Sequence, residues 1–267
     1  MKHGNSGEAL GTVHRVIEIL RLFGEKGELT LKEMSLALAL APSTCHRLLE
    51  LLGREGFIEQ DMVNRRYRIG REFFRVSGLV QSKHDVRRLA RPFLEKMVEV
   101  CDETAVFSIY VPSEGKIFFA EKVDSSMMLR YQLPMNTPVS ALWGASGRSI
   151  LAFLDRAAID RIYTAEGTAP GSGEPLPARR ALETELGNIR QRGYDITYGQ
   201  KVSGAVGIGA PVFGADGKVL GSVCITVPKT RIAAKDRPRL GDLVRSTAAE
   251  LSAALGASPM RLVRATA

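Results

Sequence analysis

The stretch APSTCHRLLELLGREGFIE, residues 41–59, limits the fold of this chain more than any other segment. Apolar residues recur in it at helical spacing and predict a helix with a single apolar stripe that faces a core. These residues are Cys45, Leu48, Leu49 and Leu52. The opposite face carries side chains that hydrogen-bond to phosphates or to base edges. A glycine and an apolar run come next, so we expect a strand after the helix.

The segments around this helix complete a small fold over residues 11–70. Apolar residues at helical spacing predict a helix over 11–24, which Gly24 closes. Thr30 and Glu33 form a capping box, which starts a second helix. Two short apolar runs around a polar segment then predict a β-hairpin after the third helix. Three helices followed by a hairpin form the winged variant of the helix-turn-helix, a DNA-binding fold.

Arginines gather in and after the predicted hairpin. Residues 65–75 hold five arginines and one acid, whereas the net charge of +8 is spread over a chain of 267 residues. Position, more than total charge, therefore marks this region for contact with phosphates. The candidates for binding double-stranded DNA are Ser43, Thr44, His46 and Arg47 on the helix and Arg65, Arg66 and Arg68 in the hairpin. From the residues alone, a solvated hairpin tip and an ordinary surface histidine are an equal alternative.

The rest of the chain predicts a linker helix and a second domain. Residues 71–86 have apolar residues at helical spacing and predict a helix that links the domains and packs on a partner. Residues 87–256 mix helices with antiparallel strands, which favours an α/β fold of the α+β type. The expected helices lie near 89–101, 144–154, 178–192 and 237–255, and the expected strands at 103–111, 116–123, 194–198, 205–213 and 218–227. Residues 1–10 and 257–267 are expected to be flexible tails.

The composition excludes several function classes. The four histidines stand at positions 3, 14, 46 and 84, which excludes a histidine-dependent hydrolase or a histidine-ligated zinc site from residues 85–267. The three cysteines form no CxxC motif, and no apolar run approaches the roughly 20 residues of a membrane span. We expect a cytoplasmic protein that is not an enzyme, makes no membrane contact and needs no cofactor or metal. The weaker alternatives are a small-molecule enzyme with an accessory DNA-binding-like domain and an architectural DNA binder without a ligand.

Five segments, in their order, resemble the IclR family of bacterial transcription regulators. They are TLKEMSLALALAPSTCHRLLELLGREGFIE, RRYRIG, GASGRSILAFL, IRQRGYDIT and VSGAVGIGAPVFGADGKVLGSVCITVP, and the resemblance spans about residues 10 to 255. It implies a winged helix-turn-helix joined by a helix to a GAF-like effector-binding domain. It also implies a homodimer or a dimer of dimers that binds a DNA operator and senses a small organic acid or aromatic catabolite. Ala39 departs from the family pattern, which usually has a glycine in this turn.

A pocket is the expected site in the second domain. Small residues before the helix near 144–154 are expected to leave backbone N–H groups free to hold an anion. By aligned position, the resemblance implies effector contacts from the amides of Ala145 and Ser146 and from Thr197, Gly207, Cys224 and Thr226. Gly207 suggests a roomier pocket that accepts an aromatic acid, and we expect Trp143 and Tyr131 to line it. The alternative is that all of these are core residues.

Overall fold

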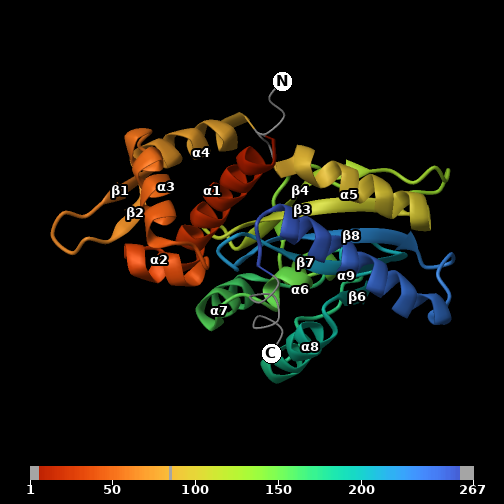
Figure 1. The fold of residues 1–267 in the computed structure, drawn as a ribbon. Helices are drawn as coiled ribbons and strands as arrows, with labels where there is room; N and C mark the ends of the chain where they lie inside the picture. The colour runs from red at the N-terminus through yellow and green to blue at the C-terminus, as the bar shows by residue number, and fades with distance from the viewer. Residues whose placement is uncertain (1–5, 84–85, 259–267) are drawn as a thin grey trace. The chain divides into compact units, whose positions relative to one another are not determined.

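The computed structural model describes residues 6–83 and 86–258, and the chain divides into two compact units between residues 84 and 85. The expected α+β class with a winged helix-turn-helix and a C-terminal antiparallel sheet is confirmed (Figure 1). The expected tails fall partly outside the described residues, at 1–5 and 259–267, and the linker helix does so at 84–85.

The N-terminal unit has three helices, a hairpin and a fourth helix. The elements are α1 (Ser6–Lys26), α2 (Leu31–Ala37), α3 (Pro42–Arg54), β1 (Ile58–Gln60), β2 (Tyr67–Ile69) and α4 (Arg71–Lys83). The stripe on α3 forms the core with residues of α1 and α2, because Cys45, Leu48 and Leu49 are fully buried against Ile19 and Met34. The strands pair antiparallel, which makes the predicted hairpin.

Helix α1 is longer than the sequence predicted. It begins within the expected tail 1–10 and continues past Gly24 to Lys26. Gly27 ends it in the left-handed region at φ +77°, and its N–H donates to the Phe23 carbonyl at 2.9 Å. The prediction at Gly24 was wrong because a glycine on an exposed helical face lowers helix stability by only about 1 kcal/mol and does not have to end the helix.

The turn between α2 and α3 stores backbone strain. The predicted capping box is present before it, since Thr30 Oγ1 accepts from the Glu33 N–H and the Glu33 carboxylate accepts from the Thr30 N–H. Ala39 then takes φ +51°, a left-handed conformation that a residue with a Cβ rarely adopts. Ser35 holds this turn, because its hydroxyl donates to the Leu40 carbonyl at 2.6 Å.

The C-terminal unit is built on a six-stranded antiparallel sheet of order β5-β4-β3-β8-β7-β6. Its strands are β3 (Thr104–Val111), β4 (Lys116–Val123), β5 (Val139–Ser140), β6 (Asp195–Tyr198), β7 (Ala205–Phe213) and β8 (Val219–Pro228). Its helices are α5 (Val86–Cys101), α6 (Ala145–Leu151), α7 (Arg156–Ala165), α8 (Arg179–Arg192), the 3-10 turn η1 (Ala234–Asp236) and α9 (Arg237–Ala254). The sequence missed α7, although Asp155 caps it by accepting from the Ala158 N–H at 2.7 Å.

Alternation along the strands sends side chains to two different layers. Val223 and Ile225 of β8 pack with α5 and α9, whereas Cys224 between them packs with Ala145 of α6. Helix α6 therefore lies on the sheet face opposite α5 and α9. This second face of the sheet carries Gly207, Cys224 and Thr226. Gly207 of β7 pairs with Thr226 of β8, and Cys224 lies two residues before Thr226 on the same strand.

Replacing Ala39 with glycine should stabilise the N-terminal unit by about 0.5–1 kcal/mol, because glycine adopts the left-handed φ without strain. Amide hydrogen exchange across α3 should slow by roughly two- to fivefold. Ala37→Gly is the matched control: Ala37 is the last residue of α2, so the same change there should speed exchange. Faster exchange in Ala39→Gly would contradict the assigned strain.

Candidate functional site

The polar face of α3 is open to solvent in its first two turns. Ser43, His46 and Arg47 are exposed and Thr44 is half-buried, while the apolar stripe of the same helix is buried. Pro42 begins the helix, at a position where its fixed φ suits the first turn. An exposed helix of this width fits the major groove of duplex DNA, where such side chains reach base edges.

The hairpin arginines differ in how they are engaged. The Arg66 guanidinium contacts the Glu33 carboxylate at 3.3 Å and the Glu28 carbonyl at 3.1 Å. Arg68 Nε donates to the Glu59 carboxylate at 2.7 Å. Within the described residues, the guanidinium groups of Arg47 and Arg65 have no such acidic partner. These two cations are therefore available to an added anion without first breaking an ion pair.

A small pocket lies between α6 and the second face of the sheet. Its lining residues are Phe119, Leu133, Gly144, Ala145, Ser146, Thr197, Gly199, Gln200, Lys201, Val202, Ala205, Gly207, Cys224 and Thr226. Six of the predicted effector contacts are thus brought together around one cavity of about 30 Å³. This free volume holds about one water molecule, so the pocket is almost filled by its own side chains.

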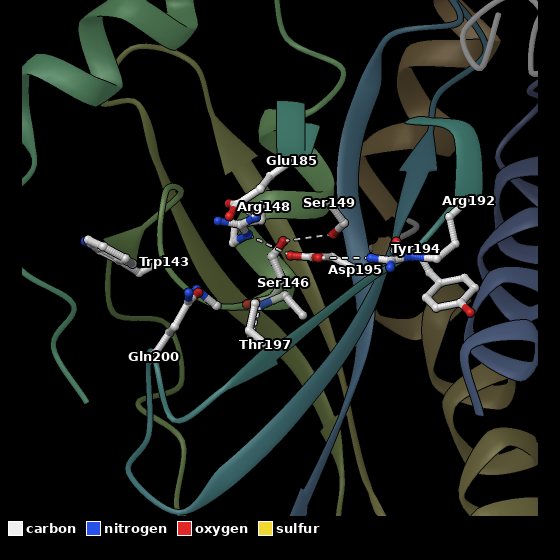
Figure 2. A network of polar contacts seen from close by, with 12 residues as sticks. Trp143, Ser146, Arg148, Ser149, Glu185, Arg192, Tyr194, Asp195, Thr197 and Gln200 are labelled. Atoms are coloured by element: carbon white, nitrogen blue, oxygen red, sulfur yellow. Dashed lines mark hydrogen bonds and ion pairs between the residues drawn. The ribbon is translucent and has the colours of Figure 1, made fainter. Parts of the chain in front are cut away.

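The backbone amides at the start of α6 are already bonded. The Ala145 N–H donates to Thr197 Oγ1 at 3.0 Å and the Gly144 N–H donates to Gln200 Oε1 at 3.2 Å (Figure 2). The expectation that these amides stand free for an anion was therefore wrong for Ala145. The sequence showed the small residues at the start of α6. It did not show that the Thr197 hydroxyl on β6 and the Gln200 side-chain oxygen in the loop after β6 accept hydrogen bonds from their amides.

Three further expectations for the pocket are corrected. Trp143 packs in a separate hydrophobic cluster with Leu142 and Ile150, and its ring points away from Thr197 (Figure 2). Tyr131 lies outside the lining. Gly207 adds no room, because a Cβ there would stand 3.3 Å from Thr197 Oγ1 and 3.4 Å from the Ala145 Cβ. The glycine lets α6 approach the sheet, so the site is tight and not widened for an aromatic ring.

The pocket contains a lysine that the sequence reasoning missed. Lys201 Nζ donates to the Ser140 carbonyl at 3.1 Å and to Ser146 Oγ at 3.3 Å, and lies 5.4 Å from the centre of the Phe119 ring. Burial lowers the pKa of the Lys201 ammonium to about 8. A lysine in a loop with a glycine at each end is usually solvated, so only the glycines hinted that the loop folds inward.

The thiol in the pocket, that of Cys224, is a poor nucleophile. Cys224 is buried on β8, and burial raises its pKa to about 12, an effect that the Lys201 charge opposes. The group is therefore a neutral thiol at physiological pH, and a thiol is a much weaker nucleophile than a thiolate. It contributes shape and a weak polar contact to the cavity.

A buried ion cluster holds α6 against β6 and α8. Arg148 donates to Asp195 at 2.8 Å and to Glu185 at 2.6 Å, and Arg192 donates to the second Asp195 oxygen at 3.2 Å (Figure 2). Burial raises the pKa of the Asp195 carboxyl, and the two guanidinium groups oppose this. Because Arg148 follows Ala145 on α6 and Asp195 precedes Thr197 on β6, the cluster fixes the two walls that meet at the pocket.

Two further classes of site were searched for in residues 6–83 and 86–258. No group of three or more His, Cys, Asp or Glu side chains in this part of the chain is arranged to hold a metal ion. None of the helices described there is long and apolar enough to cross a bilayer.

Comparisons with known proteins cover nearly the whole chain. The models "IclR helix-turn-helix domain" and "Bacterial transcriptional regulator IclR C-terminal" match residues 6–62 and 79–253. The chain is 30% identical to the probable HTH-type transcriptional regulator ArcR of Halobacterium salinarum, over 85% of this chain and 88% of that protein. It is 27% identical to the HTH-type transcriptional regulator KipR of Bacillus subtilis, over 92% of this chain and 97% of that protein.

Solved structures agree in fold. The crystal structure of the Agobacterium tumefaciens repressor BlcR superposes with a TM-score of 0.71 at 22% identity, over 93% of this chain and 98% of that one. Pseudomonas aeruginosa HmgR superposes with a TM-score of 0.72 at 20% identity, over 95% of this chain and 100% of that one. At these identities the likeness shows the fold.

Replacing Arg148 with alanine should destabilise the C-terminal unit by about 3–5 kcal/mol, because Asp195 would be left buried with a weaker set of partners. The Arg148 and Asp195 side chains are only 6% and 5% exposed, so solvent screens this pair little. Urea unfolding followed by the fluorescence of Trp143, which lies in the same unit, measures the change.

Arg156→Ala is the matched control for this measurement. The Arg156 side chain is 87% exposed and 4.0 Å from Asp160, so its loss should change stability by less than about 1 kcal/mol. Equal changes in the two variants would refute the importance of the buried cluster.

Proposed function

The chain belongs to the IclR family of bacterial transcription regulators, and we propose that it binds a DNA operator in a manner modulated by a small organic acid in the pocket behind α6. In this proposal residues 11–70 bind DNA, residues 71–86 link the domains, and residues 87–256 bind the effector. The protein acts in the cytoplasm and carries out no reaction of its own. DNA binding itself follows from the family; the acid, its site and the residues named below are proposed.

The arrangement of α3 carries the DNA part of the proposal. Cys45, Leu48 and Leu49 are turned into the core. The face with Ser43, Thr44, His46 and Arg47 is therefore presented outward near the helix start. Residues at the start of a recognition helix are the ones that reach base edges in this class of fold. Arg65 at the hairpin tip is the corresponding candidate for a phosphate contact, and Arg66 and Arg68 join it only if they exchange an internal carboxylate for a phosphate.

A homodimer or a dimer of dimers fits the apolar surface of the N-terminal unit. Val13 on α1 is 60% exposed and Phe74 on α4 is 68% exposed. Burial of such side chains against a second copy is favourable. Two copies would read two half-sites one helical turn apart on a pseudo-palindromic operator.

The pocket supports an acid as effector, and its size favours a small one. A cavity lined by hydroxyls, apolar groups and one enclosed ammonium is suited to a compact anion with an apolar part. An aromatic catabolite is less well supported, because neither Trp143 nor Tyr131 lines the cavity.

Arg47→Ala should weaken binding to the operator by about 1–3 kcal/mol and change binding to unrelated DNA little, if Arg47 reads a guanine. Arg65→Ala should weaken binding to all sequences and lower the salt slope by about 1. Gel shifts with the DNA upstream of the protein's own gene and a scrambled fragment measure both.

Arg21→Ala serves as the control, because Arg21 is exposed on α1 and already paired with Glu18 at 2.7 Å. The assignment fails if Arg47→Ala and Arg65→Ala give equal, small losses on the two fragments.

A panel of small organic acids should change the operator affinity of the wild-type protein by about 5- to 100-fold for at least one member, in either direction. The acids are acetate, lactate, succinate and benzoate, each added to the gel shift at constant ionic strength, with sodium chloride as the salt control. An unchanged shift with every acid would remove the acid from the proposal and leave the DNA-binding function standing.

A further inference from the structure

The ammonium of Lys201, which suits the pocket to an anion, has unusual surroundings. Its partners in the described part of the chain are a carbonyl (Ser140), a hydroxyl (Ser146) and the face of the Phe119 ring. None of these carries a negative charge. Glu166 and Lys116, whose charges act on the ammonium in opposite senses, form an ion pair of 3.2 Å with one another. An ammonium in such surroundings lacks the counter-ion that enclosed charges normally have.

The loop around Lys201 is built to hold the ammonium inside the pocket. Gly199 and Gly204 have φ of +67° and +74° at its two ends, which turns the chain sharply on either side. The lysine stem packs along Gly144, where an added Cβ would stand 3.0 Å from the Lys201 Cβ. The Gly144 N–H in turn bonds Gln200, the neighbour of Lys201. The backbone around Lys201 therefore directs its side chain toward the pocket.

The surroundings of the ammonium match a carboxylate that carries a second polar group. Thr197, Thr226 and Ser146 bring hydroxyls to the same cavity, while Phe119 and Leu133 supply apolar walls. Hydroxyls donate to a second ligand oxygen, and an ammonium is the natural partner of a carboxylate. With about 30 Å³ free, a ligand enters only as the lysine tip moves from Ser140 and Ser146 toward it.

We propose that Lys201 is the charge-recognition residue of the pocket, and that it binds the carboxylate of a small hydroxy acid by exchanging its bonds to Ser140 and Ser146 for an ion pair with the ligand. This deepens the proposed effector function and rests on it. It assigns selection of the negative charge to a side chain of the β6–β7 loop, whereas the amides of Gly144 and Ala145 remain bonded within the protein. The loop is then the segment that responds when a ligand enters.

Isothermal titration calorimetry at pH 7 with lactate, acetate and benzoate, and with lactamide as the uncharged counterpart of lactate, tests the proposal. Wild-type protein should bind lactate and not lactamide. Lys201→Met should lower lactate affinity by roughly 10- to 100-fold, and Lys201→Arg should stay within about fivefold of wild type. Lys218→Met, the same change at an exposed lysine, should have no effect.

Stability separates recognition from a structural role. Because Lys201→Met removes a charge without a counter-ion, its melting temperature should equal or exceed that of wild type. A structural lysine would give a lower melting temperature together with the loss of binding, and that result would overturn the proposal.

The pH dependence of wild type and Lys201→Arg gives a second readout that needs no apolar variant. The lowered pKa of about 8 means that the ammonium loses its proton above this pH, so lactate affinity should fall by up to about tenfold per pH unit there. Lys201→Arg should keep its affinity to pH 10, because guanidinium stays protonated. Of the facing groups, Cys224 has its pKa near 12 and stays neutral, and Glu166 and Lys116 are paired.

Failure of this inference is distinguishable from failure of the proposed function. If an acid changes operator binding equally in wild type and Lys201→Met, or if lactamide binds as tightly as lactate, Lys201 does not recognise the charge and the regulator function stands. If wild type binds none of the acids and its operator affinity ignores them, the acid effector and the role of Lys201 are both wrong.

Discussion

The close approach of α6 to the sheet is the constraint on which the C-terminal unit depends. A Cβ at Gly209 of β7 would stand 2.6 Å from the Ala145 carbonyl oxygen and 3.1 Å from the Ser146 backbone nitrogen of α6. Only glycine fits at such distances, and the backbone around it cannot yield cheaply. The approach brings Arg148 into the interior, where Asp195 and Glu185 neutralise it. It also reduces the space beside Cys224 to a cavity of about 30 Å³, which Lys201 helps to line.

The two units achieve order by different means. The N-terminal unit has a short helical core, and its strained turn at Ala39 is held by one hydroxyl of Ser35 and by the apolar stripe of α3. The C-terminal unit has two layers on its sheet and an internal network of charges. Strain in the first unit stays local to the turn, whereas the position of one arginine in the second unit affects both walls of a pocket.

Helices and strands with a regular spacing of apolar residues were predictable from the sequence. The positive charge that Lys201 brings to the pocket was not. The stripe on α3, the capping box at Thr30 and the strand alternation at Cys224 and Thr226 depend on local spacing, which the sequence states directly. The residues around the cavity came together as expected because the family resemblance fixed their alignment. Lys201 was missed because its position depends on how the loop between β6 and β7 folds toward Ser140 and Ser146. Trp143 was misplaced because it lies in the hydrophobic core, although the next residue, Gly144, lines the cavity. Helix α7 was missed although Asp155 caps it and Ala158, Ile159 and Ile162 recur at helical spacing.

Arg66 is paired with Glu33 and Arg68 with Glu59, which bears on the DNA contacts proposed for the hairpin. For Arg66 or Arg68 to bind a phosphate, its guanidinium would have to break its ion pair with Glu33 or Glu59. The released carboxylate would then lie close to the negatively charged DNA. In the proposed complex the gain from each new phosphate contact would be offset by repulsion between that phosphate and the released carboxylate, which would lower the affinity for DNA of any sequence. A lower affinity for non-specific DNA would shorten the residence time of the protein at sites other than its operator.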